Sequence, residues 1–167
     1  MNGGAPPSEW VVRWAPLITR GTVLDVACGG GRHANYFLRR NLAVVAVDRD
    51  PQQVPGARFI QADLEEGRPW PLPGERFEGI VVTNYLYRPL FPRLVESLSP
   101  GGVLIYETFM AGNERFGKPS NPAFLLRPGE LLEAFADLTV KGFEEGEFKD
   151  PKPAMIQRLC AVQAGKG

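Results

Sequence analysis

The stretch that decides the fold is TVLDVACGGGRHANYFLRRNLAVVAVD, residues 22–48. It begins with a β-branched run, Thr22–Ala27, which breaks into the glycines Gly29–Gly31 and continues as a helical stretch, Arg32–Arg40. A second apolar run, Ala43–Asp48, follows and ends on a carboxylate. Strand, glycine turn, helix and strand in this order predict a βαβ unit with two parallel strands.

The rest of the chain continues this alternation. Asp50 and Pro51 are suited to be the N-cap and first residue of a helix after the second strand. The Pro- and Gly-rich stretch Glu65–Arg76 predicts that the next crossover helix is short or lost. Further strands are predicted at Ala57–Asp63, Phe77–Asn84, Gly102–Thr108, Leu138–Phe148 and Ala154–Val162, and helices after the N-cap Ser8, at Phe91–Leu98 and near Pro128–Ala136.

This order of elements predicts an α/β fold, a Rossmann-like three-layer sandwich. The sheet is expected to have seven strands and to be mostly parallel. Because the last two strands are joined directly, they predict an antiparallel C-terminal edge hairpin. The length of 167 residues predicts a single domain, 1–167, with a flexible start at 1–7.

Composition excludes several classes of function. The 19 Lys and Arg balance 19 Asp and Glu, which disfavours a nucleic-acid partner. No apolar run is long enough to span a bilayer and the start does not resemble a signal peptide, so a soluble, cytoplasmic protein without a membrane partner is expected. Two cysteines, Cys28 and Cys160, lack the spacing of a metal site, and no metal is expected.

Three carboxylates lie in or at the end of successive predicted strands: Asp25, Asp48 and Asp63. Ligands of open parallel sheets bind beyond the carboxyl ends of the strands, so this edge is the expected site. The glycines satisfy the dinucleotide pattern Gly29-x-Gly31-x-x-Ala34, with Asp48 19 residues after Gly29, which keeps NAD as an alternative. Asp25 would repel a pyrophosphate but suits a ligand with ammonium and sulfonium groups, which favours S-adenosylmethionine.

The segment Asp25–Gly31 resembles the first motif of the class I S-adenosylmethionine-dependent methyltransferases, with Ala27 in place of its first glycine. The resemblance implies that Asp48 holds the ribose hydroxyls, and that Asp63 contacts the adenine amine with Ala62 and Leu64 beside the ring. The cofactor-binding residues that it implies are Asp25, Ala27, Cys28, Gly29, Gly31, His33, Asp48, Arg49, Ala62, Asp63, Leu64 and Asn84.

Two of these residues have a second interpretation. His33, the only histidine, is interpreted as a structural residue or a contact of the cofactor's amino-acid tail rather than a base. Cys28 lies at a helix N-terminus, where the pKa of a thiol tends to fall, but without a partner base it is not expected to act as a nucleophile.

Acceptor-site residues are expected after strands four and five. Tyr85, Tyr87 and Arg88 follow the fourth strand, and Glu107 lies near the exit of the fifth. The Gly112–Arg127 segment is interpreted either as a mobile cover or as a solvated loop. As a cover it would bring Arg115, Lys118 and Arg127 to the site and favour an anionic acceptor.

The form of the glycine loop and the Gly112–Gly117 loop resemble the tellurite-resistance (TehB-like) methyltransferases. Residues 83–86 (Thr-Asn-Tyr-Leu) replace the Asn/Asp-Pro-Pro-Tyr tetrad of many DNA methyltransferases, which disfavours methylation of base amino groups. The expected function is in-line methyl transfer to a small molecule or an exposed group. An NAD-dependent oxidoreductase and a catalytically silent cofactor-binding partner protein stay as alternatives, and the oligomeric state stays open.

Overall fold

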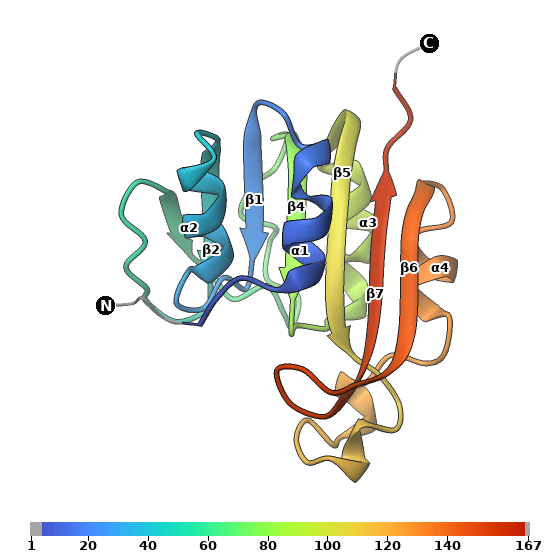
Figure 1. The fold of residues 1–167 in the computed structure, drawn as a ribbon. Coiled ribbons are helices and arrows are strands. Elements are labelled where there is room, and N and C mark those ends of the chain that lie inside the picture. Colours follow the sequence, from blue (N-terminus) through green and yellow to red (C-terminus); the bar gives the residue numbers. More distant parts are fainter. Residues whose placement is uncertain (1–4, 166–167) are drawn as a thin grey trace.

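The computed structural model describes residues 5–165. Its fold is built on one mixed β-sheet (Figure 1). Its strand order is β3-β2-β1-β4-β5-β7-β6. Strands β1 to β5 run parallel, and β7 is antiparallel to both β5 and β6. The strands are β1 (Thr22–Val26), β2 (Ala43–Asp48), β3 (Arg58–Gln61), β4 (Phe77–Thr83), β5 (Leu98–Phe109), β6 (Thr139–Phe148) and β7 (Ala154–Val162).

Short helices cover the two faces of the sheet. In Figure 1, α1 and α2 lie in front of the sheet, while α3 and α4 lie behind it. The α-helices are α1 (Glu9–Trp14), α2 (Arg32–Arg39), α3 (Phe91–Glu96) and α4 (Glu130–Ala134), and the 3₁₀ helices are η1 (Ala15–Leu17), η2 (Arg88–Leu90), η3 (Asn113–Arg115) and η4 (Pro122–Phe124).

Alternation along the central strands divides the core between these two faces. Val23 packs in the cluster that contains Trp10 of α1 and Phe37 of α2. Its neighbour Leu24 packs in the other cluster, with Leu94 of α3. Since a strand buried on both faces needs apolar residues at successive positions, the continuous runs of β1 and β2 follow from their central place.

The chain reverses its winding direction between β1 and β4, which are paired in parallel. From β1 the chain first moves outward to β2 and β3, and then returns to add β4 and β5 on the other side of β1. The loops after β1 and β4 therefore diverge at the carboxyl edge of the sheet. Such a switch point leaves room for a ligand in an open α/β sheet.

The predicted α/β fold, the mostly parallel sheet and the antiparallel terminal hairpin are confirmed. Strand three is shorter than predicted, at Arg58–Gln61, and strand five begins earlier, at Leu98. Residues 62–76 contain no helix, as their Pro and Gly content predicted. The predicted helix at Asp50 and Pro51 is wrong, because residues 49–57 contain no helix.

Two further expectations concern the flexible start at residues 1–7 and a membrane-spanning segment. Residues 1–4 of the predicted flexible start lie outside the described part, whereas the carbonyl of Pro6 accepts a hydrogen bond from Arg32. Within residues 5–165, no helix has the length and apolar character that crossing a membrane requires.

Candidate functional site

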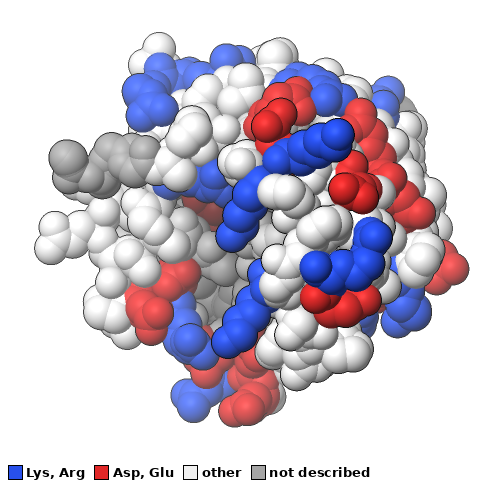
Figure 2. All heavy atoms as spheres, turned by 60° about the horizontal axis from the view of Figure 1, so that its bottom comes forward, with Lys and Arg blue, Asp and Glu red and all other residues white. Residues whose placement is uncertain are grey.

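A cavity of about 500 Å³ lies along the carboxyl ends of the parallel strands. It extends from the loops after β1 and β2 to the exits of β4 and β5 and the segment that follows β5. The face that carries this edge of the sheet is hollowed near its centre, with Lys and Arg side chains on both sides of the hollow (Figure 2). Predicted site residues that line the cavity are Ala27, Asp48, Arg49, Ala62, Asp63, Leu64, Asn84 and Tyr85.

The glycine loop begins at this cavity: Ala27 lines it, whereas Gly29 and Gly31 do not. Gly29 has a φ of +54°, and a Cβ atom built there would meet no heavy atom within 4 Å. Gly31 has a φ of +89° and is the N-cap of α2, where a Cβ would meet Val54 at 3.1 Å. Ala27 also takes a positive φ, 57°, which an alanine adopts only at a cost in free energy. Ala27 thus adopts the left-handed backbone conformation that favours glycine, although it replaces the first glycine of the motif.

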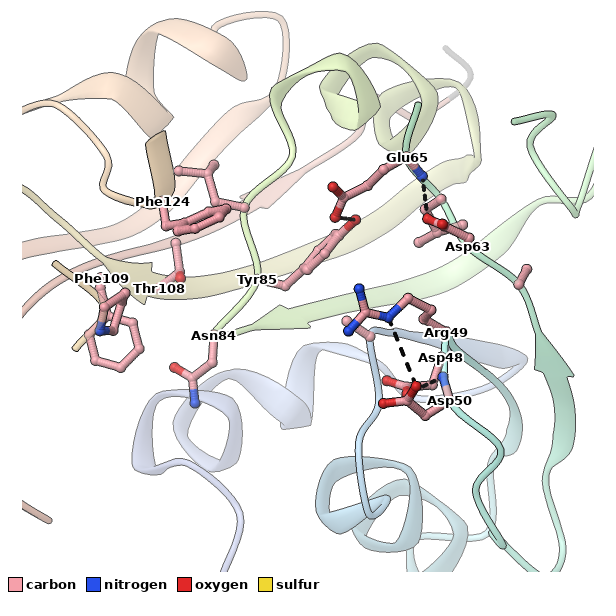
Figure 3. A pocket seen from close by; sticks show the side chains of 15 residues that line it. Asp48, Arg49, Asp50, Asp63, Glu65, Asn84, Tyr85, Thr108, Phe109 and Phe124 are labelled. Carbon is pink, nitrogen blue, oxygen red and sulfur yellow. Dashed lines mark hydrogen bonds and ion pairs between the residues drawn. The ribbon is translucent and has the colours of Figure 1, made fainter. Parts of the chain in front are cut away.

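Asp48 holds the loops after β1 and β2 together. Its Oδ1 accepts a hydrogen bond from Gly29 N at 3.1 Å, and its Oδ2 accepts from Asp50 N at 3.0 Å and Gln52 Nε2 at 3.3 Å. A carboxylate has about four acceptor positions, so Asp48 keeps capacity for a ligand. In Figure 3 its side chain lies at the cavity near those of Arg49 and Asp50.

A second acidic group lies after β3. The Oδ1 atom of Asp63 accepts a hydrogen bond from Glu65 N at 2.9 Å, and Glu65 in turn accepts from the hydroxyl of Tyr85 at 2.9 Å (Figure 3). Burial, with the bond to Glu65, raises the pKa of Tyr85 above its usual value. Tyr85 is therefore a neutral hydrogen-bonding group at the wall of the cavity.

Asp25 lies beneath the glycine loop rather than in the cavity. Its side chain is buried, and Oδ2 accepts a hydrogen bond from Ala34 N in the first turn of α2 at 3.0 Å. Burial raises its pKa to about 7, although the bond from Ala34 opposes this shift. The structure thus gives Asp25 a role in positioning the loop and helix, and places no part of it in the lining.

Cys28 and His33 are also turned inward. Burial, and then the nearby charges of Asp25 and Asp48, raise the pKa of Cys28 to about 12, so the predicted fall in its pKa is wrong. His33 Nε2 accepts a hydrogen bond from Ser8 N at 3.0 Å, and its Nδ1 lies 3.4 Å from Thr83 Oγ1. Burial, with the nearby charge of Arg32, lowers the pKa of His33 to about 3, which fits its structural interpretation.

The other predicted acceptor residues make contacts within the fold. The hydroxyl of Tyr87 accepts from Glu66 N, and Glu107 accepts from both Ser8 Oγ and Arg158. Arg115 is exposed and lies 3.9 Å from a carboxylate oxygen of Glu147. None of these three predicted residues is among the described residues that line the first cavity.

Arg88 connects the 112–127 segment to α4. It forms an ion pair with the buried Glu130 and donates hydrogen bonds to the carbonyls of Ala123 and Leu125. Burial alone would raise the pKa of Glu130, but its bonds to Arg88 and Arg127 outweigh this effect and lower it. The charge of Arg88 is thus compensated inside the fold.

The 112–127 segment does reach the first cavity, but through apolar residues. Pro119 and Phe124 line it, whereas Arg115, Lys118 and Arg127 do not. In this arrangement Arg127 pairs with Glu130, and Arg115 lies 3.9 Å from Glu147. The closing of this segment as a mobile cover stays a prediction.

Sequence reasoning missed several lining residues: Asp50, Glu65, Leu86, Thr108, Phe109, Pro119 and Phe124. Thr108 and Phe109 follow Glu107 at the end of β5, so the strand-exit rule could have found them. No pattern in the sequence around Phe124 indicates that its side chain lines the cavity. Its position depends on the hydrogen bonds that Arg88 donates to the carbonyls of the two neighbouring residues.

Known proteins resemble this chain in sequence. The model of a family described as a methyltransferase domain matches residues 24–106. A trans-aconitate 2-methyltransferase of Methylobacterium nodulans is 32% identical over 110 residues, which cover 59% of this chain and 42% of that protein. The same enzyme of Rhizobium leguminosarum is 28% identical, over 70% of this chain and 48% of that protein. The chain thus spans less than half the length of these relatives.

Solved structures share the fold. TehB from Haemophilus influenzae has a TM-score of 0.74 at 17% identity, covering 97% of this chain and 64% of that one. A Burkholderia thailandensis 1,6-didemethyltoxoflavin-N1-methyltransferase, solved with its substrate and S-adenosylhomocysteine, has a TM-score of 0.64 at 19% identity, covering 93% of this chain and 76% of that one. At these identities the likeness concerns the fold.

Fold and cavity together define an α/β domain with a cavity at the carboxyl edge of its sheet, where open parallel sheets bind their ligands. The chain carries a methyltransferase domain at residues 24–106 and has the fold of the class I S-adenosylmethionine-dependent methyltransferases, whose cofactor is S-adenosylmethionine. The comparisons support neither an NAD-dependent oxidoreductase nor a catalytically silent partner protein.

Proposed function

We propose that this protein transfers the methyl group of S-adenosylmethionine to a small molecule that carries a carboxylate. The observation that carries the proposal is the cavity itself, which joins two acids at neighbouring strand ends, Asp48 and Asp63, to the open exits of β4 and β5. A volume of about 500 Å³ is within the range of cavities that enclose small ligands.

Asp48 is proposed to bind the ribose hydroxyls and Asp63 the adenine amine. Both groups are hydrogen-bond donors, and an ionised carboxylate only accepts, so each pairing is complementary. Ala62 and Leu64 lie on either side of Asp63 in the lining and offer apolar contact to the ring. The open space above Gly29 lets the cofactor approach the backbone closely.

When bound, S-adenosylmethionine supplies an electrophilic methyl carbon, which the acceptor oxygen takes while the carbon–sulfur bond breaks and its electron pair stays on sulfur. An ionised carboxylate can accept a methyl group without losing a proton. The residues at hand suit such an acceptor, because His33 is neutral with both ring nitrogens directed at protein partners and Glu107 is held by Arg158. The work of the chain is then positioning and exclusion of water.

The relatives support an acid as the acceptor, since their name describes the methylation of trans-aconitate, a carboxylic acid. The small size of the cavity supports a small molecule rather than a folded partner. We propose neither a nucleic acid nor a membrane as a partner of this protein.

Calorimetry with S-adenosylhomocysteine tests the cofactor site, using Asp48→Ala and Asp50→Ala as a matched pair. Both acids line the cavity, but only Asp48 is proposed to bind the ribose. Charge-assisted hydrogen bonds contribute about 1.5–3 kcal/mol each, so Asp48→Ala is expected to weaken binding roughly tenfold or more, and Asp50→Ala by less than about threefold. Asp48→Asn, which keeps an acceptor for Gly29 N, controls for a disturbed loop.

Equal affinities of the two alanine variants, each shown to be folded by circular dichroism, would contradict the assignment of Asp48. Binding of NAD but not S-adenosylhomocysteine would overturn the proposed function. Methylation is then measured with trans-aconitate and a panel of other small carboxylic acids. Cofactor binding without transfer to any of them would favour the silent binding protein.

A further inference from the structure

A second cavity, of about 360 Å³, opens beside the first. Three parts of the chain that are far apart in sequence form its walls: the segment before α1, the exit of β5, and the β6–β7 turn with the start of β7. Its lining includes Arg32, Asn84, Glu107, Phe109, Lys152 and Arg158.

The two cavities share Asn84 and Phe109. Asn84 follows β4 with a φ of 55°, a left-handed conformation that is uncommon outside glycine, and its N–H donates to the carbonyl of Glu107 at 2.9 Å. Its side chain projects from the exit of β4 (Figure 3). The shared residues make this the place where two ligands, one in each cavity, would meet.

A buried polar network fixes the wall between the N-terminal segment and the sheet. The hydroxyl of Ser8 donates to Glu107 Oε1 at 2.6 Å, while Ser8 N donates to His33. The other carboxylate oxygen of Glu107 accepts from Arg158 Nε. Since each partner comes from a different element, the cavity has a preformed shape.

The lining of this cavity carries three cations and three acids, so it has no formal net charge. Two of its cations nevertheless have no ion-pair partner among the described residues, because the pairs within the fold involve the other charged residues. Glu107 is paired with Arg158, and the other glutamate of the lining, Glu9, is paired with Arg13 at 2.8 Å. Arg32 donates to the carbonyl of Pro6, and neither Arg32 nor Lys152 forms an ion pair with any described residue. These two cations outnumber the one remaining lining acid, Asp150.

The first cavity offers no such cation beyond the β4 exit. There its lining consists of Tyr85, Leu86, Thr108, Phe109, Pro119 and Phe124. An anion that enters the second cavity instead meets two cations, Arg32 and Lys152, that no described carboxylate pairs with.

We propose that the second cavity binds the acceptor, with a carboxylate group held by Lys152 and Arg32 and the accepting oxygen directed to the junction at Asn84. This inference rests on the proposed function and adds the acceptor's place and charge. Because Arg32 lies at the start of α2, beside the proposed cofactor site, Lys152 is the residue that distinguishes the acceptor from the cofactor.

The test compares Lys152→Ala with Lys149→Ala. Lys149 lies three residues away on the same turn and lines neither cavity. Carboxylate binding is measured by calorimetry on the complex with S-adenosylhomocysteine, using a panel of tricarboxylates, dicarboxylates and aromatic monocarboxylates, together with neutral amide analogues. Lys152→Ala is expected to weaken carboxylate binding roughly tenfold, while Lys149→Ala leaves it unchanged.

A second variant, Ile156→Trp, fills the second cavity from β7. It is expected to abolish carboxylate binding and leave S-adenosylhomocysteine affinity within about threefold. The inference is overturned if Lys152→Ala binds carboxylates as the wild type does, if amides bind as well as acids, or if no carboxylate of the panel binds the wild-type complex. Failure of the wild type to bind S-adenosylhomocysteine overturns the proposed function instead, so the two failures are distinguishable.

Discussion

His33 shows how burial determines the chemistry of a single residue. Its ring is buried, accepts from Ser8 N, and has a pKa lowered to about 3. In the unfolded chain the pKa returns to 6.5, so the unfolded state binds the proton more readily. The contribution of His33 to stability is therefore present above pH 6.5 and is lost as the pH falls towards 3, at up to about 1.4 kcal/mol per pH unit.

The expected result is an imidazole that stays neutral in the folded protein from pH 8 to about pH 4, measured by NMR titration. The assignment is simple because the sequence contains one histidine. Asp25 acts in the opposite direction: its pKa is raised to about 7, so its contribution is present below 3.8 and is lost as the pH rises through 7. Urea unfolding of Asp25→Asn at several pH values separates the two groups. A ring that titrates near 6.5 in the native protein would show that the imidazole is not buried as described.

The sequence predicts which acids lie in or after a strand, but it does not predict which of them reach the cavity. Asp48 and Asp63 follow apolar runs, and both line the cavity. Asp25 instead lies within β1 and is buried beneath the glycine loop, where it accepts a hydrogen bond from Ala34 N in the first turn of α2. Spacing shows that a residue is near a strand end, and the packing around it decides whether it reaches a ligand.

Among the elements, the 112–127 segment depends on one side chain of η2. Arg88 pairs with Glu130 and donates to two carbonyls of the segment. We expect Arg88→Ala to lower the free energy of unfolding by about 1.5–3 kcal/mol, the usual contribution of hydrogen bonds to charged groups, because Glu130 is left buried. Hydrogen exchange at residues 122–126 should become faster in this variant.

Arg93→Ala is the matched control, since Arg93 pairs with Glu96 on the surface of α3 at 3.6 Å. Exposed pairs contribute about 0–1 kcal/mol. Equal losses of stability in the two variants, or unchanged exchange at 122–126 in Arg88→Ala, would show that the segment is held by other contacts.

The helix predicted after β2 failed for a reason that the sequence contains. Pro55 follows Pro51 by four residues, so in a helix it would lack the N–H that bonds to residue 51 and its ring would clash with that carbonyl. Gly56 then takes a positive φ, 95°, and turns the chain into β3. The predicted helix relied on the helix-start signal at Asp50 and neglected Pro55, which prevents a helix there.

In the whole molecule, the layers could be predicted but the second cavity could not. Apolar runs and their order determine which strands are central, and these are visible in residues 22–48. The wall of the second cavity depends on Ser8 meeting Glu107, which lies 99 residues away. Such contacts leave no periodic signal, because a single hydrogen bond between distant segments constrains only two positions.

Balanced charge over the whole chain predicts weak binding to nucleic acid, even though Lys and Arg side chains border the hollow on the carboxyl face (Figure 2). Several Lys and Arg side chains of the described residues have acidic partners, as in the Arg13–Glu9 and Arg127–Glu130 pairs, so fewer are available to displace counterions from phosphates. We expect no micromolar affinity for DNA or RNA in gel shifts at about 150 mM salt, with at most weak binding at low salt. Micromolar binding that persists at the higher salt would show that the cations around the hollow act together on a polyanion, and would favour a macromolecular acceptor over a small acid.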